Sequence, residues 1–322
     1  MATRIEIVDP LQYAGVASQI LQAAWKPPCL RYSADYLAWQ FSFPSHLPRR
    51  GAIALLDDRA VGCIGVTTRR FMCAGNLLSA YVLSFVAVDP SASRRGLAAA
   101  MYASLLDALP LEIPVLAFTE PASIGERLLL DSFARASFRH RSLQACRATG
   151  YLARQGSTPS RSSGAAALEA DSYKAYASAH QAPAEGNIVW TDITREDWEH
   201  YRQDPRERTM VTVRDAAGNS VGTAMFVSAE IISSQGVQRV PMLDGVDLRG
   251  PTAETLAALF GFAASRSQPG STVVASNLSY IDAGVIRAAG ARALPSSFNA
   301  HAFARGKTTI VEGADALNLE VT

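Results

Sequence analysis

The feature that most limits the fold of this chain is an internal repeat. Residues of the first half recur in the second half at offsets of 158 to 160, after similar turns or inside similar apolar runs. The matched pairs are Val61-Gly62 with Val221-Gly222, Val88-Asp89 with Val246-Asp247, and Val115 with Val273. Solenoid repeats span ~20–50 residues, so a period of this size predicts two copies of one domain.

The length of the chain agrees with two domains. Its 322 residues exceed the size of about 250–300 residues at which single cores stop growing. Residues 154–165 are rich in Ser, Gly and Pro, which is typical of a linker. We predict a first domain at 1–152, a linker at 153–166 and a second domain at 167–322. Apolar periodicity predicts the order βααβββαβαβ for each copy, a mixed α/β fold.

The charge balance and the hydropathy exclude several classes of partner. Lys and Arg number 30 against 29 Asp and Glu, so the net charge is only +1. That balance does not predict the large basic face of a nucleic-acid-binding protein. No apolar run approaches the ~18 residues of a membrane span, and the N-terminus lacks the apolar core of a signal peptide. We expect a cytoplasmic protein with no nucleic-acid or membrane partner.

The cysteines and histidines do not predict a metal site. The cysteines are widely spaced, without a CxxC motif or a Cys/His cluster: Cys29, Cys63, Cys73 and Cys146. We expect reduced thiols and no metal. The histidines show neither triad nor ligand spacing, and each is expected to be a surface or internally satisfied residue: His46, His140, His180, His200 and His301.

Residues 85–98, Phe-Val-Ala-Val-Asp-Pro-Ser-Ala-Ser-Arg-Arg-Gly-Leu-Ala, predict a strand, a tight turn at Pro90 and an alanine-rich helix over residues 93–109. The N–H groups at the start of such a helix are free to bind an anion. Gly96 lets a ligand approach the backbone closely, and Arg94 and Arg95 add positive charge. The segment therefore predicts a phosphate-binding site.

This segment resembles motif A of the GCN5-related N-acetyltransferases (GNAT family). Val88, Pro90, Gly96 and Ala98 fit the motif, whereas Ser93 stands where Gln or Arg is usual and Arg94 stands where a second Gly is common. The resemblance covers roughly residues 3–150 and, more weakly, 185–306 as a second copy. It implies two tandem GNAT-like acyltransferase domains.

The resemblance also implies a cofactor and a reaction. In this family two strands splay apart, and the exposed backbone of one binds the pantetheine arm of acyl-CoA while the next turn binds pyrophosphate. The residues that this implies are Val86, Ala87, Val88, Ser93, Arg94, Arg95, Gly96, Leu97, Ala98 and Ala99. We expect acetyl-CoA or another acyl-CoA as co-substrate, and direct attack by the amine of a small molecule in a ternary complex.

The second copy departs from the motif. Its matching segment, Val246 to Thr252, has no Gly-x-Gly/Ala at the helix start, and Pro251 removes an N–H group. We expect this copy to brace the first without binding CoA. Because the chain already carries two copies, an internal pseudo-dimer predicts a monomer.

The acid and base are less defined. Ser84 lies where the family often has a catalytic Glu and could position a water. Glu120 follows the strand at Val115–Thr119 and is either the base or a surface or capping residue. Phe133 stands where the family often has a thiolate-protonating Tyr, so Tyr81, water or unassisted thiolate release would substitute.

For the acceptor, Arg31 and Tyr32 fall in the segment that this family uses for substrate binding. Two other functions remain open. One is a non-catalytic CoA-binding or scaffolding protein, and the other is a nucleotide-type phosphate-binding module, although a Walker lysine and a GxGxxG motif are absent. The acceptor and the acyl chain length do not follow from the sequence.

Overall fold

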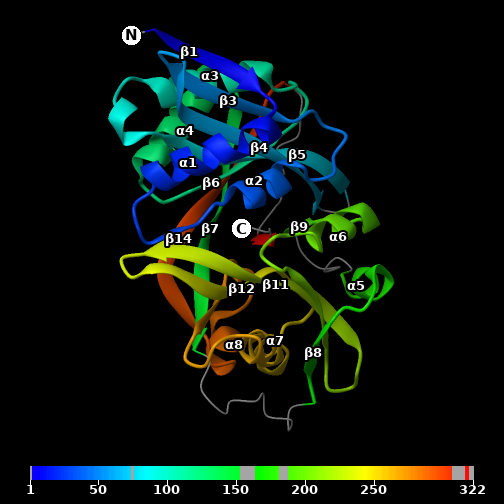
Figure 1. Cartoon of the computed structure of the whole chain (residues 1–322). Coiled ribbons are helices and arrows are strands. Elements are labelled where there is room, and N and C mark those ends of the chain that lie inside the picture. Colours follow the sequence, from blue (N-terminus) through cyan, green and yellow to red (C-terminus); the bar gives the residue numbers. More distant parts are fainter. Residues whose placement is uncertain (1, 74–75, 153–163, 181–187, 307–315, 319–322) are drawn as a thin grey trace.

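A single twisted sheet runs through both halves of the chain (Figure 1). The structure is a computed structural model that describes residues 2–73, 76–152, 164–180, 188–306 and 316–318. The main strand order is β1-β3-β4-β5-β6-β14-β7-β13-β12-β11-β10-β8. Short strands β2, β9 and β15 pair outside this path. Most of the predicted linker, residues 153–163, lies outside the described residues.

The first half confirms the predicted order of elements, with one short strand added. Ser33 and Ser123 cap the second and fourth α-helices by accepting the N–H groups of Tyr36 and Glu126. The elements are β1 (Thr3–Val8), η1 (Pro10–Tyr13), α1 (Ala14–Ala24), β2 (Cys29–Leu30), α2 (Ala34–Phe41), β3 (Arg50–Leu56), β4 (Arg59–Cys73), β5 (Asn76–Val88), η2 (Pro90–Ala92), α3 (Leu97–Ala108), β6 (Val115–Thr119), α4 (Ile124–Arg135) and β7 (Arg139–Leu152).

The second half repeats this order, and the mixed α/β fold class is confirmed. Its helices α5 to α8 occupy the places of α1 to α4 in chain order. The elements are β8 (Ala166–Glu169), α5 (Tyr173–Ala179), β9 (Ile188–Thr191), α6 (Arg195–Tyr201), β10 (Thr209–Arg214), β11 (Ser220–Ser233), β12 (Gly236–Leu248), α7 (Ala253–Ser265), β13 (Thr272–Ala275), α8 (Ala283–Ala288), β14 (Arg292–Ala304) and β15 (Ala316–Asn318).

The two halves exchange their last long strands. β14 of the second half lies between β6 and β7, with Asn299 opposite Thr119. β7 of the first half pairs in turn with β13, with Tyr151 opposite Val273. Figure 1 shows β7 and β14 running side by side between the halves. Each half thus completes the sheet of the other. The domain limits at residues 152 and 167 stay a prediction.

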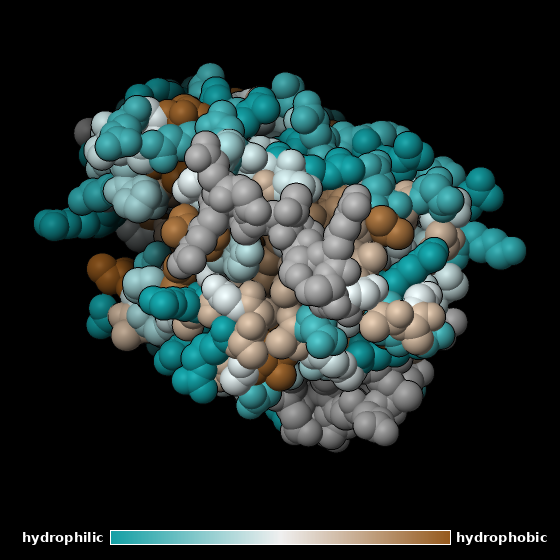
Figure 2. Space-filling view, turned by 90° about the horizontal axis from the view of Figure 1, so that it is seen from below, coloured by the Kyte–Doolittle hydropathy of each residue, from teal (hydrophilic) through white to brown (hydrophobic). Residues whose placement is uncertain are grey.

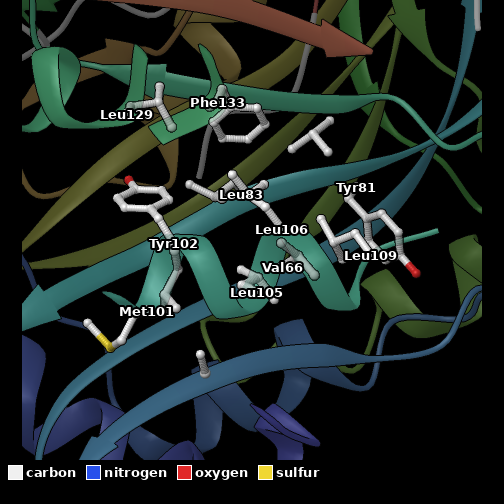
Figure 3. Close-up of a cluster of buried hydrophobic side chains, with 14 of the residues drawn as sticks. Val66, Tyr81, Leu83, Met101, Tyr102, Leu105, Leu106, Leu109, Leu129 and Phe133 are labelled. Atoms are coloured by element: carbon white, nitrogen blue, oxygen red, sulfur yellow. The ribbon is translucent and has the colours of Figure 1, made fainter. Parts of the chain in front are cut away.

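The largest core cluster packs α3 and α4 against β3 to β6 (Figure 3). Leu97, Met101 and Leu105 of α3 are buried at helical spacing. Phe133 of α4 is fully buried and stacks on Phe303 of β14, with ring centroids 3.8 Å apart. The core of the first half therefore includes a residue from the second half.

A second aromatic cluster joins the halves on the opposite face. Tyr36, Trp39 and Phe43, from α2 and the residues after it, pack with Trp198 and Tyr201 of α6. Trp39 Nε1 also donates a hydrogen bond to the His200 carbonyl, at 2.9 Å. The second half thus braces the helix layer of the first.

The face of the molecule that is seen from below has a polar margin (Figure 2). In the view from below, hydrophilic residues make up most of the margin of the molecule, and residues of intermediate or apolar character lie nearer its centre (Figure 2). Within the described residues, no helix combines the length and the apolar character needed to cross a bilayer.

Candidate functional site

Strands β5 and β6 diverge in the middle of the first half. They pair in parallel only where Tyr81–Leu83 face Val115–Ala117. Just beyond, the register between β4 and β5 shifts between Cys63 and Gly65, and Phe85 adopts a left-handed φ of 60°. A bulge of this kind bends a strand away from its neighbour. The strands therefore leave a gap beside residues 84–88.

The backbone of β5 presents polar groups to this gap. The Asp89 N–H group donates to the Val61 carbonyl on β4, at 2.7 Å. Because the groups of successive strand residues point to opposite sides, the backbone groups of Val86 and Val88 point towards the gap. They can bind an extended chain with amide groups.

A cavity of about 680 Å³ occupies the gap. Leu83, Tyr102 and Leu129 form an apolar wall on the side of α3 and α4, whereas Tyr32 and Tyr36 form an aromatic wall on the side of α2. The cavity therefore combines largely apolar walls with a few polar groups, as most ligand sites do.

The turn after β5 leaves the start of α3 open. Asp89 Oδ1 accepts hydrogen bonds from the N–H and hydroxyl groups of Ser91, which keeps the pKa of this carboxyl below its usual value. Gly96 is the residue before the helix, with φ at 72°, and a Cβ on it would meet no atom within 4 Å. The first hydrogen bond of the helix joins Ala100 N–H to the Gly96 carbonyl.

The N–H groups of Leu97, Ala98 and Ala99 precede the first hydrogen bond of the helix. These three groups are free to donate hydrogen bonds to an anion. The helix begins at Leu97, later than the predicted Ser93, because residues 90–92 form a 3-10 turn. The Ser93 N–H group donates to the Pro90 carbonyl within that turn. A contact from Ser93 to a ligand would therefore come from its side chain.

Four of the predicted site residues line the cavity together. Ser84 and Val86 lie on β5, Tyr32 lies before α2, and Glu120 follows β6. Glu120 is the only carboxylate among the described lining residues. The structure thus brings both predicted polar groups, Ser84 and Glu120, to one cavity, and their roles stay predictions.

Two other predicted residues lie elsewhere. Tyr81 is fully buried below the cavity, and its hydroxyl points away from the neighbouring core side chains (Figure 3) to donate to the Pro48 carbonyl at 3.0 Å. Burial raises the pKa of Tyr81. Arg31 faces the second half, with Nη1 2.9 Å from Glu230 Oε2. Neither residue is part of the described cavity lining. The predicted roles of Tyr81 as a proton donor and of Arg31 in acceptor binding therefore have no supporting contact with the cavity.

Two of the histidines lie together and are satisfied by hydrogen bonds, as the sequence predicted for histidines inside the fold. His301 Nδ1 of β14 lies 3.1 Å from His140 Nε2 of β7. Its other ring nitrogen, Nε2, lies 2.9 Å from Thr119 Oγ1, at the edge of the cavity. The two histidines are 161 residues apart, close to the repeat period, and that spacing is the signal that could have predicted their pairing.

The strand register corrects one match in the repeat. Gly62 pairs with Val88 in the first half, and Gly222 pairs with Leu248 in the second. The Arg249 N–H group donates to Val221, as Asp89 does to Val61. Val88 therefore corresponds to Leu248 at an offset of 160, and its match with Val246 at 158 is wrong, because short apolar runs align equally well two residues apart.

The gap of the second half is closed by its own side chain. The Tyr280 hydroxyl donates to the Val246 carbonyl at 2.8 Å and accepts from the Leu248 N–H group at 3.2 Å. These two groups correspond to those of Val86 and Val88 that face the open gap. Tyr280 thus takes the hydrogen bonds that a ligand would make.

The turn of the second half is also shorter. Residues 249–252 join β12 to α7, whereas residues 89–96 join β5 to α3. Thr252 caps α7 in a reciprocal capping box with Thr255, which satisfies N–H groups at the helix start. The start of α7 thus differs from the open start of α3, and the absence of CoA binding in the second copy stays a prediction.

Comparison with known proteins identifies the family. Residues 16–122 match the sequence profile of the Acetyltransferase (GNAT) family. The first half therefore contains a GNAT-family domain, as the motif at residues 85–98 predicted. A search of curated proteins found no match.

Solved structures share the fold over the whole chain. N-myristoyltransferase from Saccharomyces cerevisiae, with bound myristoyl-CoA, matches with a TM-score of 0.62 and 11% identity, over 100% of this chain and 86% of that chain. A GCN5-related N-acetyltransferase from Sphaerobacter thermophilus matches at 0.57 and 14%, over 95% and 98%. Another, from Anabaena variabilis, matches at 0.56 and 13%, over 93% and 72%.

Proposed function

We propose that this protein is an acyl-CoA-dependent N-acyltransferase that transfers an acyl group, most simply acetyl, to the amine of a small molecule. The observation that carries the proposal is the gap between β5 and β6, with its cavity of about 680 Å³ and the open helix start beside it. The GNAT family match supports the same activity.

In this proposal the first half alone binds acyl-CoA. The pantetheine amides pair with the backbone of Val86 and Val88, and the pyrophosphate lies on the N–H groups of residues 97–99. Arg94 and Arg95 add positive charge beside that turn, and the α3 dipole favours the anion. The absence of side-chain obstruction in front of Gly96 supports this placement.

The acceptor enters on the aromatic side of the cavity, beside Tyr32 and Tyr36. Its neutral amine attacks the thioester carbonyl, and Glu120 takes up a proton directly or through a water held by Ser84. Phe133 offers no proton, because it is an apolar ring stacked in the core. The departing thiolate takes its proton from the amine or from water. Since the two halves share strands, we propose a monomer.

The test of cofactor binding compares the two copies. Acetyl-CoA at 100 times its Kd should stabilise the wild type by about 2.7 kcal/mol, measured as a rise in Tm. Gly96→Asp places a carboxylate beside the N–H groups of residues 97–99 and strains the backbone at a positive φ. This variant should abolish the rise in Tm. The matched control is Gly250→Asp, since Gly250 also has a positive φ, 52°, and open space around it, and it should retain the rise. No shift in the wild type would exclude both an enzyme and a CoA-binding scaffold.

A non-catalytic CoA-binding scaffold is the second candidate, and the buried Phe133 in place of a proton donor favours it. Thiol release from acetyl-CoA with a panel of primary amines separates the two. A Tm shift without thiol release above the rate of hydrolysis would support the scaffold.

A further inference from the structure

A continuous chain of hydrogen-bonding side chains leads from the cavity to the protein surface. Thr119 lines the cavity, and its Oγ1 lies 2.9 Å from His301 Nε2. His301 is 3% exposed, and its Nδ1 lies 3.1 Å from Nε2 of His140, which is exposed to solvent. The three residues lie on β6, β14 and β7, which are neighbours in the sheet. The path therefore depends on the exchange of strands between the halves.

A buried carboxylate holds the middle of this path. Glu126 Oε1 accepts a hydrogen bond from Asn299 Nδ2 at 2.7 Å, and Oε2 accepts the Ala122 N–H group at 2.7 Å. Oε1 also lies 3.2 Å from both Thr119 Oγ1 and His301 Nε2. The hydrogen bond from Asn299 is the largest cause that lowers the pKa of Glu126. An ionised Glu126 therefore orients Thr119 and stabilises positive charge that forms on His301.

Burial favours the neutral form of both imidazoles. Burial lowers the pKa of His301 and of His140, while the charge of Glu126 opposes this at both. Glu126 on α4 is the charged group that faces the pair, and β6 and β14 contribute the neutral Thr119 and Asn299. Phe303 stacks on His140 with ring centroids 5.1 Å apart. A neutral imidazole carries one donor and one acceptor nitrogen, as proton relay requires.

We propose that Thr119, His301 and His140 form a proton-exit relay for acyl transfer in the first half. The proposal rests on the proposed function. The balanced reaction is R–NH3⁺ + R′C(O)–S–CoA → R′C(O)–NH–R + HS–CoA + H⁺. A C–N bond forms and the C–S bond breaks. Of the two protons that leave the ammonium nitrogen, one ends on the thiolate and the other must leave the cavity.

The relay moves that second proton in successive steps. Glu120 takes it up first and passes it to Oγ1 of Thr119, the preceding residue in the cavity lining. Thr119 passes its own hydroxyl proton to His301 Nε2. His301 gives its Nδ1 proton to His140 Nε2. His140 then releases its Nδ1 proton to bulk water. Both ring nitrogens of His301 face a partner in the relay, so one proton passes without side-chain movement. The two rings then return to their starting tautomers before the next turnover. The second copy thus supplies a central group of the reaction although its own gap is closed.

Kinetics of thiol release from acetyl-CoA with a panel of primary amines test the relay. Thr119→Val and His301→Gln should each lower kcat about 100-fold, in the range of general acid–base effects, with KM for acetyl-CoA within about two-fold of the wild type. Thr119→Ser should recover most of the loss. His46→Ala removes an exposed histidine far from the relay in sequence and should leave kcat unchanged.

Chemical rescue separates proton transfer from a structural role. His140→Ala removes the exposed end of the relay and should lower kcat about 10-fold, and added imidazole should restore it because imidazole replaces the missing acceptor. If imidazole does not restore kcat, His140 has a structural role and the relay is wrong. The same conclusion follows if His140→Ala also abolishes the rise in Tm that acetyl-CoA gives in the wild type.

Nitrogen-15 NMR of the histidine rings tests the continuity of the path without turnover. Thr119→Val should change the tautomer ratio of His140, two hydrogen bonds away, as well as that of His301. An unchanged His140 signal would overturn the relay even in an active enzyme. If the wild type releases no thiol with any amine, the proposed function itself fails, and the relay as its proton exit fails with it.

Discussion

The two copies share one backbone plan but differ in what fills the gap between their central strands. In the first copy the backbone of Val86 and Val88 faces a cavity of about 680 Å³. In the second copy the Tyr280 hydroxyl bonds to the corresponding groups of Val246 and Leu248. One hydroxyl thus replaces a ligand. The difference teaches that two copies of one fold can keep the same strand register while a side chain fills the gap in one of them.

The closed copy nevertheless contributes to the open one. Its strand β14 completes the sheet beside β6, and its Phe303 lies in the core of the first half. Asn299 and His301 on the same strand reach the edge of the cavity through Glu126 and Thr119. The second copy therefore completes the structure around the cavity of the first.

The largest loss of stability is expected from Phe303→Ala, which tests whether the two halves unfold together. Truncating a fully buried aromatic side chain costs about 3–5 kcal/mol, and here the ring belongs to the second half while its main contact, Phe133, belongs to the first. Urea denaturation should show this loss as one cooperative transition. If the first half unfolds in a separate transition at the same urea concentration as in the wild type, the halves are independent. Phe298→Ala, at a half-buried ring on the same strand, is the control and should cost less.

A second effect concerns Asp247, whose position in the first copy is taken by Ala87. Asp247 is 1% exposed, and both of its carboxyl oxygens lack a hydrogen-bond partner among the described residues. Burial raises its pKa to about 7. The nearby His180 Nδ1, 3.6 Å away, belongs to a ring whose pKa burial lowers to about 4. Both groups are therefore neutral in slightly acidic solution.

The sign of the pH effect follows from the raised pKa. The unfolded carboxyl ionises near pH 4 and the folded one near pH 7, so the contribution of Asp247 to the free energy of unfolding falls as pH rises between these values. His180 contributes the opposite trend below about pH 6.5, so the effect of Asp247 is the difference between the wild type and Asp247→Asn. The fall is roughly 4 kcal/mol at most. Asp247→Asn should remove it, measured by denaturation at pH 5 and pH 8, whereas Asp131→Asn on the surface should not. An identical pH dependence in Asp247→Asn and wild type would contradict the assignment.

The smallest effect is expected from Tyr280→Phe. It leaves the ring in place but removes the hydroxyl that satisfies Val246 and Leu248, which should cost about 1–3 kcal/mol. Acetyl-CoA should give no additional binding in titration calorimetry, because the short turn before α7 still lacks an anion site. Tyr151→Phe, in a ring that stacks on Phe260 outside the gap, is the control. A second acetyl-CoA site in Tyr280→Phe would mean that the hydroxyl alone closes the copy.

Much of the fold was predictable because its signals are local. The order of elements follows from apolar periodicity and from caps such as Ser33 and Ser123. The placement of Ser84, Val86 and Glu120 beside one cavity follows from their positions at the ends of neighbouring strands. The start of α3 was predicted four residues early, since a 3-10 turn and a helix have similar local patterns.

The rest of the site depends on contacts between distant residues. Tyr81 and Arg31 carry suitable chemical groups, but packing directs one hydroxyl to Pro48 and the other side chain to Glu230. The pairing of His140 with His301 requires β14 to lie beside β7. Periodicity within one strand carries no information about which strand will be its neighbour.

The sequence by itself determined the strand, turn and helix at residues 85–98 and the existence of two copies, because Pro90, Gly96 and apolar spacing act on the nearby backbone. Only the tertiary structure decided that the copies exchange β7 and β14, that Tyr280 closes one gap, and that Thr119 meets His301 beside the other. Those outcomes depend on long-range strand pairing and side-chain packing, whose free energy arises from groups brought together only in the folded chain.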